Sequence, residues 1–281
     1  LMDILLIIKA IIMGVVEGIA EFLPISSTGY LILSADIMNF LSGEFRNLFI
    51  VFIQLGAILA VIYDYWGRLW GAFIGLITGH SPDLTKPRQL GFSLMIASLP
   101  VVVVGFTMAD FITNALFHPL VVATMLILGA LIIIYAEKNP RPIHAPEAEN
   151  ISFKTALGIG LCQCLALIPG TSRSGSTIIG ALLLGTSRKA ATEFSFFLGI
   201  PVIIGAALLD LIKHFDAIQT LTDWLILLIG TGVSFVIALL CIRLMVAWVS
   251  QKDFMIFAWL RIATGVLVLI AFFGFNYQIQ A

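Results

Sequence analysis

Charged residues are scarce in this sequence. Lysine, arginine, aspartate and glutamate make up 11% of the chain, whereas they make up about a quarter of an ordinary soluble domain. Hydrophobic residues make up 60%, the formal net charge is -1, and basic runs are absent. The composition is therefore typical of a membrane protein, and the absence of a basic patch argues against a nucleic-acid partner.

Cysteine is also rare. Cys162, Cys164 and Cys241 lie in or beside apolar segments, and a bare C-x-C is their only close spacing. We expect packed thiols, because neither a disulfide framework nor a zinc site has this pattern. The apolar run 4–16 leads into glutamates without a signal-peptide cleavage pattern, so we expect it to belong to the folded protein.

Long apolar runs predict an all-α polytopic membrane protein. Crossing the hydrocarbon core takes about 20 apolar residues in a helix, and a lipid-exposed backbone must satisfy its own hydrogen bonds. Six segments approach or reach that length: 48–63, 91–109, 117–136, 194–212, 224–242 and 254–275.

A weak internal repeat divides the chain near its midpoint. The stretch "EFLPISSTG" (21–29) resembles "ALIPGTSRSG" (166–175), and a proline-rich polar segment (137–154) separates the halves. Each motif precedes three predicted crossings, an odd number, so the second half is expected to be inverted relative to the first. We predict one integral membrane domain, 1–281, built from repeat halves 1–145 and 146–281.

The distribution of basic residues predicts the orientation. On this topology ten basic residues lie on one side of the membrane and three on the other, which makes the first side cytoplasmic. The first motif then enters from the outer face and the second from the inner face. We expect their tips to meet near the middle of the membrane.

The first motif combines carboxylates with hydroxyls. Glu17 and Glu21 are four residues apart and share a face of a helix. Pro24 interrupts that helix, and the hydroxyls that follow are placed to cap a second helix from about Gly29; they belong to Ser26, Ser27 and Thr28.

The second motif supplies a cation. Pro169 and Gly170 break the chain, and hydroxyls and backbone N–H groups follow at another predicted helix start: Thr171, Ser172, Ser174 and Gly175. Helix N-termini bind phosphate, and the guanidinium of Arg173 can hold phosphate oxygens bidentately.

The glutamates would repel a phosphate unless a divalent cation lay between them, so Glu17 and Glu21 are candidate ligands for Mg²⁺ or Ca²⁺. The two motifs together predict a metal-assisted phosphoryl-transfer site. The alternative for Glu17, Glu21 and Arg173 is an internal ion pair. For Glu193 and Arg261, which lack hydroxyl neighbours, we favour structural pairing.

Three stretches resemble the undecaprenyl-diphosphate phosphatase family of the bacitracin-resistance type: "GVVEGIAEFLPISSTG" (14–29), "LIPGTSRSGSTI" (167–178) and "EFSFFLGIP" (193–201). The resemblance implies six crossing helices plus two re-entrant helical hairpins in inverted repeats. It also implies metal-dependent hydrolysis of a polyprenyl diphosphate lipid at the outer face of the cytoplasmic (inner) membrane, which recycles the carrier for peptidoglycan synthesis.

The resemblance also implies residue roles. Glu17 and Glu21 match the acidic pair that holds the metal or assists proton transfer, Ser27 the nucleophile or direct phosphate contact, and Arg173 the phosphate-binding arginine. Phosphate-binding roles carry over to the remaining motif residues: Ser26, Thr28, Gly29, Gly170, Thr171, Ser172, Ser174 and Gly175.

Position 30 departs from the family pattern, which has histidine where this chain has Tyr30. Tyrosine, with an ordinary pKa of about 10, is a poor base at neutral pH, and none of the four histidines lies next to a motif. Three interpretations stay open: Glu17 or Glu21 acts as the base, turnover is slowed or substrate is trapped, or the activity is altered.

Two other functions compete. Broken helices in inverted repeats are also typical of transporters, and a lipid-phosphate flippase would use Arg173 as well; the glutamate pair favours the phosphatase. The phosphohistidine class of lipid phosphatase is excluded, because neither motif contains histidine. Glycine-rich helices such as "GALLLG" (180–185) permit a homodimer.

Overall fold

The computed structural model describes residues 4–78, 84–116 and 118–275, and these ranges form helices and connecting loops without a β-strand. Six helical segments in the described chain are long and apolar enough to cross a membrane: Gly43–Asp64, Thr85–Met108, Pro119–Lys138, Arg188–Lys213, Leu221–Val249 and Met255–Gly274. The predicted fold class, an all-α polytopic membrane protein, is confirmed. Phe117, the first residue of one predicted crossing, lies outside the described residues.

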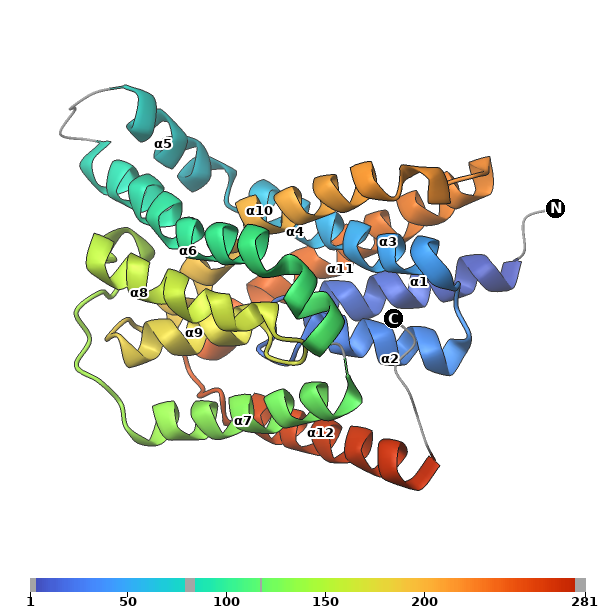
Figure 1. Cartoon of the computed structure of the whole chain (residues 1–281). Coiled ribbons are helices and arrows are strands. Elements are labelled where there is room, and N and C mark those ends of the chain that lie inside the picture. Colours follow the sequence, from blue (N-terminus) through green and yellow to red (C-terminus); the bar gives the residue numbers. More distant parts are fainter. Residues whose placement is uncertain (1–3, 79–83, 117, 276–281) are drawn as a thin grey trace.

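Each motif lies at the tip of a pair of short packed helices. The first pair is α1 (Ile4–Ala20) and α2 (Ser27–Met38). The second is α8 (Phe153–Cys164), extended by a 3₁₀ turn at Leu165–Leu167, and α9 (Arg173–Leu183). In Figure 1 the first pair enters from the right and the second from the left, so the two tips meet inside the bundle.

The longer helices surround these two pairs. α7 and α12 lie side by side, and α11 packs against both α1 and α4 (Figure 1). The bounds of these and the remaining elements are α3 (Gly43–Phe52), α4 (Gln54–Asp64), α5 (Trp66–Ile77), α6 (Thr85–Leu116), α7 (Pro119–Lys138), α10 (Arg188–Lys213), α11 (Leu221–Val249) and α12 (Met255–Phe275), with 3₁₀ turns at Ala148–Asn150 and Phe215–Ala217.

Glycines let α11 approach the helices that carry the first motif. A Cβ atom on Gly56 of α4 would lie 2.2 Å from the carbonyl oxygen of Thr231, and one on Gly18 of α1 would lie 2.8 Å from that of Ser234. Small residues that allow such close backbone contact are typical of membrane helix packing. They fix the end of α1, and with it the first motif, against the bundle.

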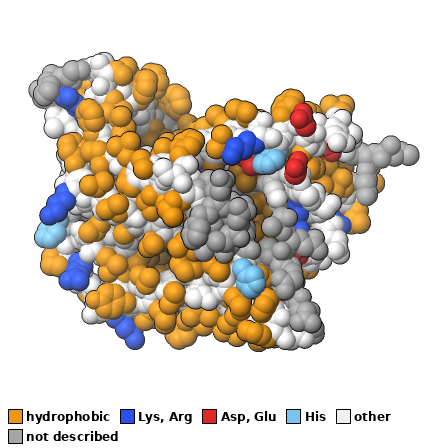
Figure 2. Space-filling model, viewed as in Figure 1, with side chains coloured by type: hydrophobic (Ala, Val, Ile, Leu, Met, Phe, Trp, Pro, Cys, Tyr) orange, Lys and Arg blue, Asp and Glu red, His pale blue; other side chains and the backbone are white. Residues whose placement is uncertain are grey.

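The surface is largely apolar. Figure 2 shows hydrophobic side chains over most of the face drawn, with several lysine and arginine side chains at its left end and others near the centre and right. Large side chains such as Phe106 and Ile212 are about three-quarters exposed, at 75% and 76%. Only a lipid surrounding makes such an exterior stable, because contiguous apolar patches of this extent are rare on soluble proteins.

Glu193 has the structural partner that the sequence favoured. Its carboxylate accepts a hydrogen bond from Arg68 Nη1 at 2.9 Å, and Arg68 Nε donates to Glu149 at 2.8 Å. The cluster joins α5, α10 and the turn at Ala148–Asn150. The prediction of structural pairing for Glu193 is confirmed.

Arg261 of α12 is also structural, but its partners are backbone carbonyls. The side chain is fully buried and forms no ion pair with a described carboxylate. Its guanidinium donates, at 3.0 to 3.2 Å, to five carbonyl oxygens, which belong to Pro24, Met125, Leu126, Gly170 and Thr171. One side chain therefore binds both motif loops and α7.

The fit around Arg261 depends on a glycine in α7. A Cβ atom on Gly129 would lie 2.1 Å from Arg261 Nη2, so any larger residue there would displace the guanidinium. The five N–H donors of arginine are arranged in a rigid plane, whereas lysine offers a single ammonium group.

We expect Arg261→Lys to destabilise the fold, because several buried carbonyls would lose their donor at about 1 to 3 kcal/mol each. Fluorescence-detected thermal unfolding in detergent should show a midpoint several degrees lower. The control is Arg243→Lys, which alters an exposed ion pair with Asp64, and exposed pairs contribute little. Equal midpoints for the two variants would contradict a central role for Arg261.

Candidate active site

The first loop begins where α1 ends, at Ala20. Glu21 lies just beyond the helix, yet its N–H still donates to the Glu17 carbonyl at 3.0 Å, so the helical spacing of the two glutamates is kept. Ser26 adopts a left-handed backbone (φ 80°) at the N-cap, and α2 begins at Ser27, two residues before the predicted start. The side chain of Ser26 makes no capping hydrogen bond.

The second loop has matching geometry. Gly170 has a φ of 89°, and a Cβ atom there would lie 2.4 Å from the Val122 carbonyl oxygen, so only glycine fits. Ser172 is the N-cap of α9 with a φ of 73°, and its hydroxyl accepts a hydrogen bond from Gly175 N at 3.0 Å. Serines with positive φ angles thus precede both helices.

The two loops are in direct contact, as the sequence predicted. Ser174 Oγ, in the first turn of α9 directly after the second loop, donates to the Leu23 carbonyl in the first loop at 2.9 Å. Beside this contact lies a cavity of about 250 Å³. Its wall contains most of the predicted site residues: Glu21, Ser26, Ser27, Thr28, Gly29, Gly170, Ser172, Arg173 and Ser174.

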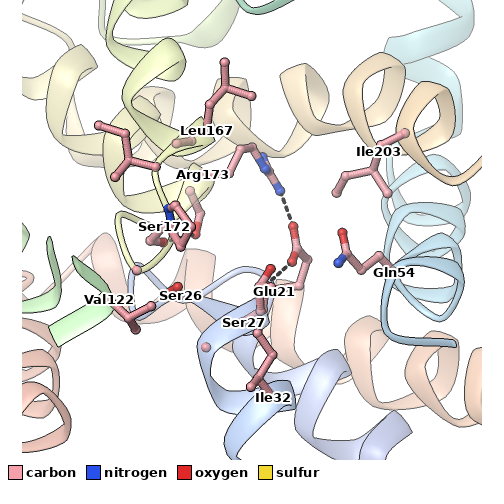
Figure 3. A pocket seen from close by; sticks show the side chains of 18 of the residues that line it. Glu21, Ser26, Ser27, Ile32, Gln54, Val122, Leu167, Ser172, Arg173 and Ile203 are labelled. Carbon is pink, nitrogen blue, oxygen red and sulfur yellow. Dashed lines mark hydrogen bonds and ion pairs between the residues drawn. The ribbon is translucent and has the colours of Figure 1, made fainter. Parts of the chain in front are cut away.

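Glu21 connects polar side chains from the two halves of the chain. Its Oε2 accepts a hydrogen bond from Ser27 Oγ at 2.5 Å. Its Oε1 forms an ion pair with Arg173 Nη2 at 2.7 Å (Figure 3). Arg173 Nη1 donates to the Ser195 carbonyl at 2.7 Å. Because the second partner holds the guanidinium in place, Ser27, Glu21 and Arg173 form a connected set.

An internal ion pair was the alternative for Glu17, Glu21 and Arg173, and the structure contains such a pair between Glu21 and Arg173 but not at Glu17. The ion pair nevertheless lies on the cavity wall, and Glu21 also accepts a hydrogen bond from the Ser27 hydroxyl. A purely structural ion pair would not require this serine. The guanidinium has room because residue 199 is glycine: a Cβ atom there would lie 2.7 Å from Arg173 Nη1.

Glu17 lies one helical turn behind Glu21. Its side chain is fully buried, does not line the cavity, and accepts no hydrogen bond from the described residues through either carboxylate oxygen. An unpaired buried carboxylate calls for a cation or a proton. Among the described residues there is no group of three or more metal-ligating side chains, so a cation here would take further ligands from phosphate and water, as Mg²⁺ usually does.

The structure brings three other predicted site residues near the cavity but not onto its wall. The Tyr30 hydroxyl is hydrogen-bonded to Thr264 Oγ1 of α12 at 2.7 Å. Thr171 is buried and offers its carbonyl to Arg261, and Gly175 offers its N–H to Ser172. Tyr30 therefore faces α12, although it follows Ser27 by only three positions.

Sequence reasoning missed two polar residues on the cavity wall, Gln54 of α4 and Gln163 of α8. The available signal was an amide inside an otherwise apolar helical segment, which is costly in lipid. The rest of the wall is mainly apolar and includes Ile32, Leu33, Val101, Val122, Val202, Ile203, Ala206 and Val268.

Comparison with known proteins identifies the family. The family model described as "Bacitracin resistance protein BacA" matches residues 10–267. The chain is 69% identical over 277 residues to the undecaprenyl-diphosphatase of Psychrobacter cryohalolentis, with 99% of each chain covered. It is 58% identical to undecaprenyl-diphosphatase 1 of Acinetobacter baylyi, over 96% of this chain and 97% of that one.

A more distant relative matches over the same extent. The undecaprenyl-diphosphatase of Ectopseudomonas mendocina is 45% identical over 270 residues, which covers 95% of each chain. The matched family range, residues 10–267, includes both motif loops and extends into the sixth candidate span. This chain belongs to the bacitracin resistance protein BacA family.

Proposed function

We propose that this chain is a membrane phosphatase that hydrolyses undecaprenyl diphosphate to undecaprenyl phosphate and inorganic phosphate. The names of its relatives support the reaction and the substrate. The observation that carries the proposal is the contact of Glu21 with both Ser27 and Arg173 on a cavity wall where two helices begin. Phosphoryl transfer needs a nucleophile, a base and a positive group that binds the phosphate, and Ser27, Glu21 and Arg173 supply these in turn.

The chemistry follows from these contacts. Glu21 accepts the proton of the Ser27 hydroxyl while the Ser27 oxygen attacks the terminal phosphorus of the diphosphate. The bond from that phosphorus to the bridging oxygen breaks, and undecaprenyl phosphate leaves. Water then hydrolyses the phosphoserine. Arg173 and the N–H groups at the starts of α2 and α9 stabilise the charge on the phosphate oxygens.

A divalent cation, Mg²⁺ or Ca²⁺, fits the carboxylates Glu17 and Glu21. The unpaired oxygens of Glu17 support this assignment. When bound, such a cation would neutralise charge on the phosphate oxygens. The residues of the chain orient the substrate and move the proton.

The proposed setting is the bacterial cytoplasmic membrane, with the cavity serving the outer face. The lysine and arginine side chains at the left end of the face in Figure 2 support this orientation, because that end would be cytoplasmic. The apolar part of the cavity wall suits the prenyl chain next to the diphosphate. The phosphatase would thereby return the lipid carrier to cell-wall synthesis.

Ser27→Ala is expected to lower kcat at least about a hundredfold, since nucleophile and proton transfer are both lost. Phosphate release from purified protein measures this. Ser250→Ala, whose hydroxyl only bonds within α11, serves as the control and should retain full activity. Wild-type protein quenched in acid during turnover should carry phosphate on Ser27 by mass spectrometry. An inactive Ser27→Ala variant without phosphoserine in the wild type would make Ser27 a phosphate ligand instead.

Removal of divalent cations with EDTA should abolish phosphate release, and Mg²⁺ or Ca²⁺ should restore it. Glu17→Gln should raise the cation concentration needed for half-maximal activity by about tenfold or more, because a charged ligand is replaced by a neutral one. Unchanged cation dependence in this variant would contradict the role of Glu17. A protein that releases no phosphate under any cation but moves the lipid between leaflets would be a transporter.

Tyr30→His is expected to change kcat by less than about threefold. Tyr30 contacts Thr264 and does not line the cavity, and Glu21 already provides a base. Tyr30→Phe should lower the thermal midpoint slightly, since a hydrogen bond contributes about 1 kcal/mol. If histidine at this position raises kcat more than about tenfold, position 30 reaches the phosphate and the base assignment to Glu21 alone is incorrect.

A further inference from the structure

Gln163 has an unusual environment. It lies on α8, its side chain is fully buried, and it lines the cavity. Neither its amide oxygen nor its amide nitrogen has a hydrogen-bond partner among the described residues. Buried polar groups are nearly always paired, so an unpaired one beside a cavity points to a role in binding a ligand there.

Other glutamines in the described chain do find partners. Gln54, on the same cavity wall, donates to the Ile50 carbonyl at 3.4 Å, and Gln89 donates to the Ile151 carbonyl at 3.0 Å. Gln163 is the only glutamine among the described residues for which both amide atoms are buried and unpaired. Its amide therefore has unused hydrogen-bonding capacity next to the cavity.

The repeat gives Gln163 a counterpart in the first half. Gln163 precedes the positive-φ serine Ser172 by nine residues, and Glu17 precedes Ser26 by the same number. The first half thus has a carboxylate where the second has a neutral amide. A carboxylate needs a cation between itself and phosphate, whereas an amide N–H can donate to a phosphate oxygen directly.

The neighbours of Gln163 indicate which phosphate it meets. Within the second half it shares the cavity wall with Ala166, Leu167 and Ile168, a short apolar stretch that follows α8. The prenyl chain requires an apolar surface, and the phosphate nearest that surface is the one attached to the chain. The terminal phosphate would then contact Ser27, Glu21 and Arg173.

We propose that Gln163 is a substrate-binding residue whose amide N–H donates to the prenyl-linked phosphate of the diphosphate, the phosphate that remains on the product. This inference rests on the proposed phosphatase function. Because the same contact exists in substrate, transition state and product, its loss weakens binding and leaves the chemical step nearly unchanged.

Gln163→Met tests the inference, since methionine has a similar length and an apolar end. We expect KM to rise roughly tenfold to a hundredfold, the usual effect of losing a hydrogen bond to a charged group. kcat should stay within about threefold. Inhibition by undecaprenyl phosphate should weaken by the same factor as KM, and inhibition by inorganic phosphate should not change. The thermal midpoint should hold or rise, because an unpaired buried amide is removed.

Gln89→Leu is the matched control, because it removes an amide that is already paired with a carbonyl. It should lower the thermal midpoint and leave KM unchanged. Gln163→Glu, which keeps the shape and adds repulsion, should raise KM more than Gln163→Met. An unchanged KM in Gln163→Met, or a KM change that accompanies a lower thermal midpoint, would overturn the inference.

Failure of the inference and failure of the proposed function give different results. If the wild type releases no phosphate, the phosphatase function fails. Binding of undecaprenyl phosphate to wild type and Gln163→Met in detergent then still tests the amide contact. If the wild type is active and the two proteins bind undecaprenyl phosphate equally, only the role of Gln163 is wrong.

Discussion

Five backbone carbonyls that converge on the Arg261 guanidinium hold the two motif loops together. In the membrane interior no water satisfies a backbone group that leaves a helix, so a broken helix needs donors from elsewhere in the protein. Pro24 and Gly170 create such breaks, and Arg261 supplies their donors. The positions of Ser27 and Arg173 follow from this arrangement, because each lies within three residues of a loop carbonyl that Arg261 binds.

The Glu21–Arg173 ion pair depends on the attachment of both motif loops to Arg261. Glu21 belongs to the first half of the chain and Arg173 to the second, and their side chains are nearly buried, with exposed fractions of 5% and 13%. A buried ion pair loses much of its value if its geometry is poor. The loops must therefore be held in register, which the Ser174–Leu23 contact and Arg261 both do. Neither half contains the connected set alone.

Much of this arrangement could be predicted from sequence. Apolar length located the six spans, and the spacing of prolines, glycines and hydroxyls located two helix starts and most of the cavity wall. The direction of a side chain on a helix with apolar neighbours on all sides could not be predicted. For this reason the contact of Tyr30 with Thr264 was not predicted. The role of Arg261 was equally hidden, because its five partners come from segments far apart in the chain.

The charges around the cavity are the physical reason for proposing a divalent cation. The wall carries one carboxylate, Glu21, and one guanidinium, Arg173, which neutralise each other, and the buried carboxyl of Glu17 lies directly behind them. A diphosphate brings at least two further negative charges. Arg173 cannot neutralise both Glu21 and the substrate, and an uncompensated charge in a buried site is costly. In the proposed function, a divalent cation held by the two glutamates would neutralise this charge. On the inference drawn for Gln163, its neutral amide would meet phosphate in the second half without a cation.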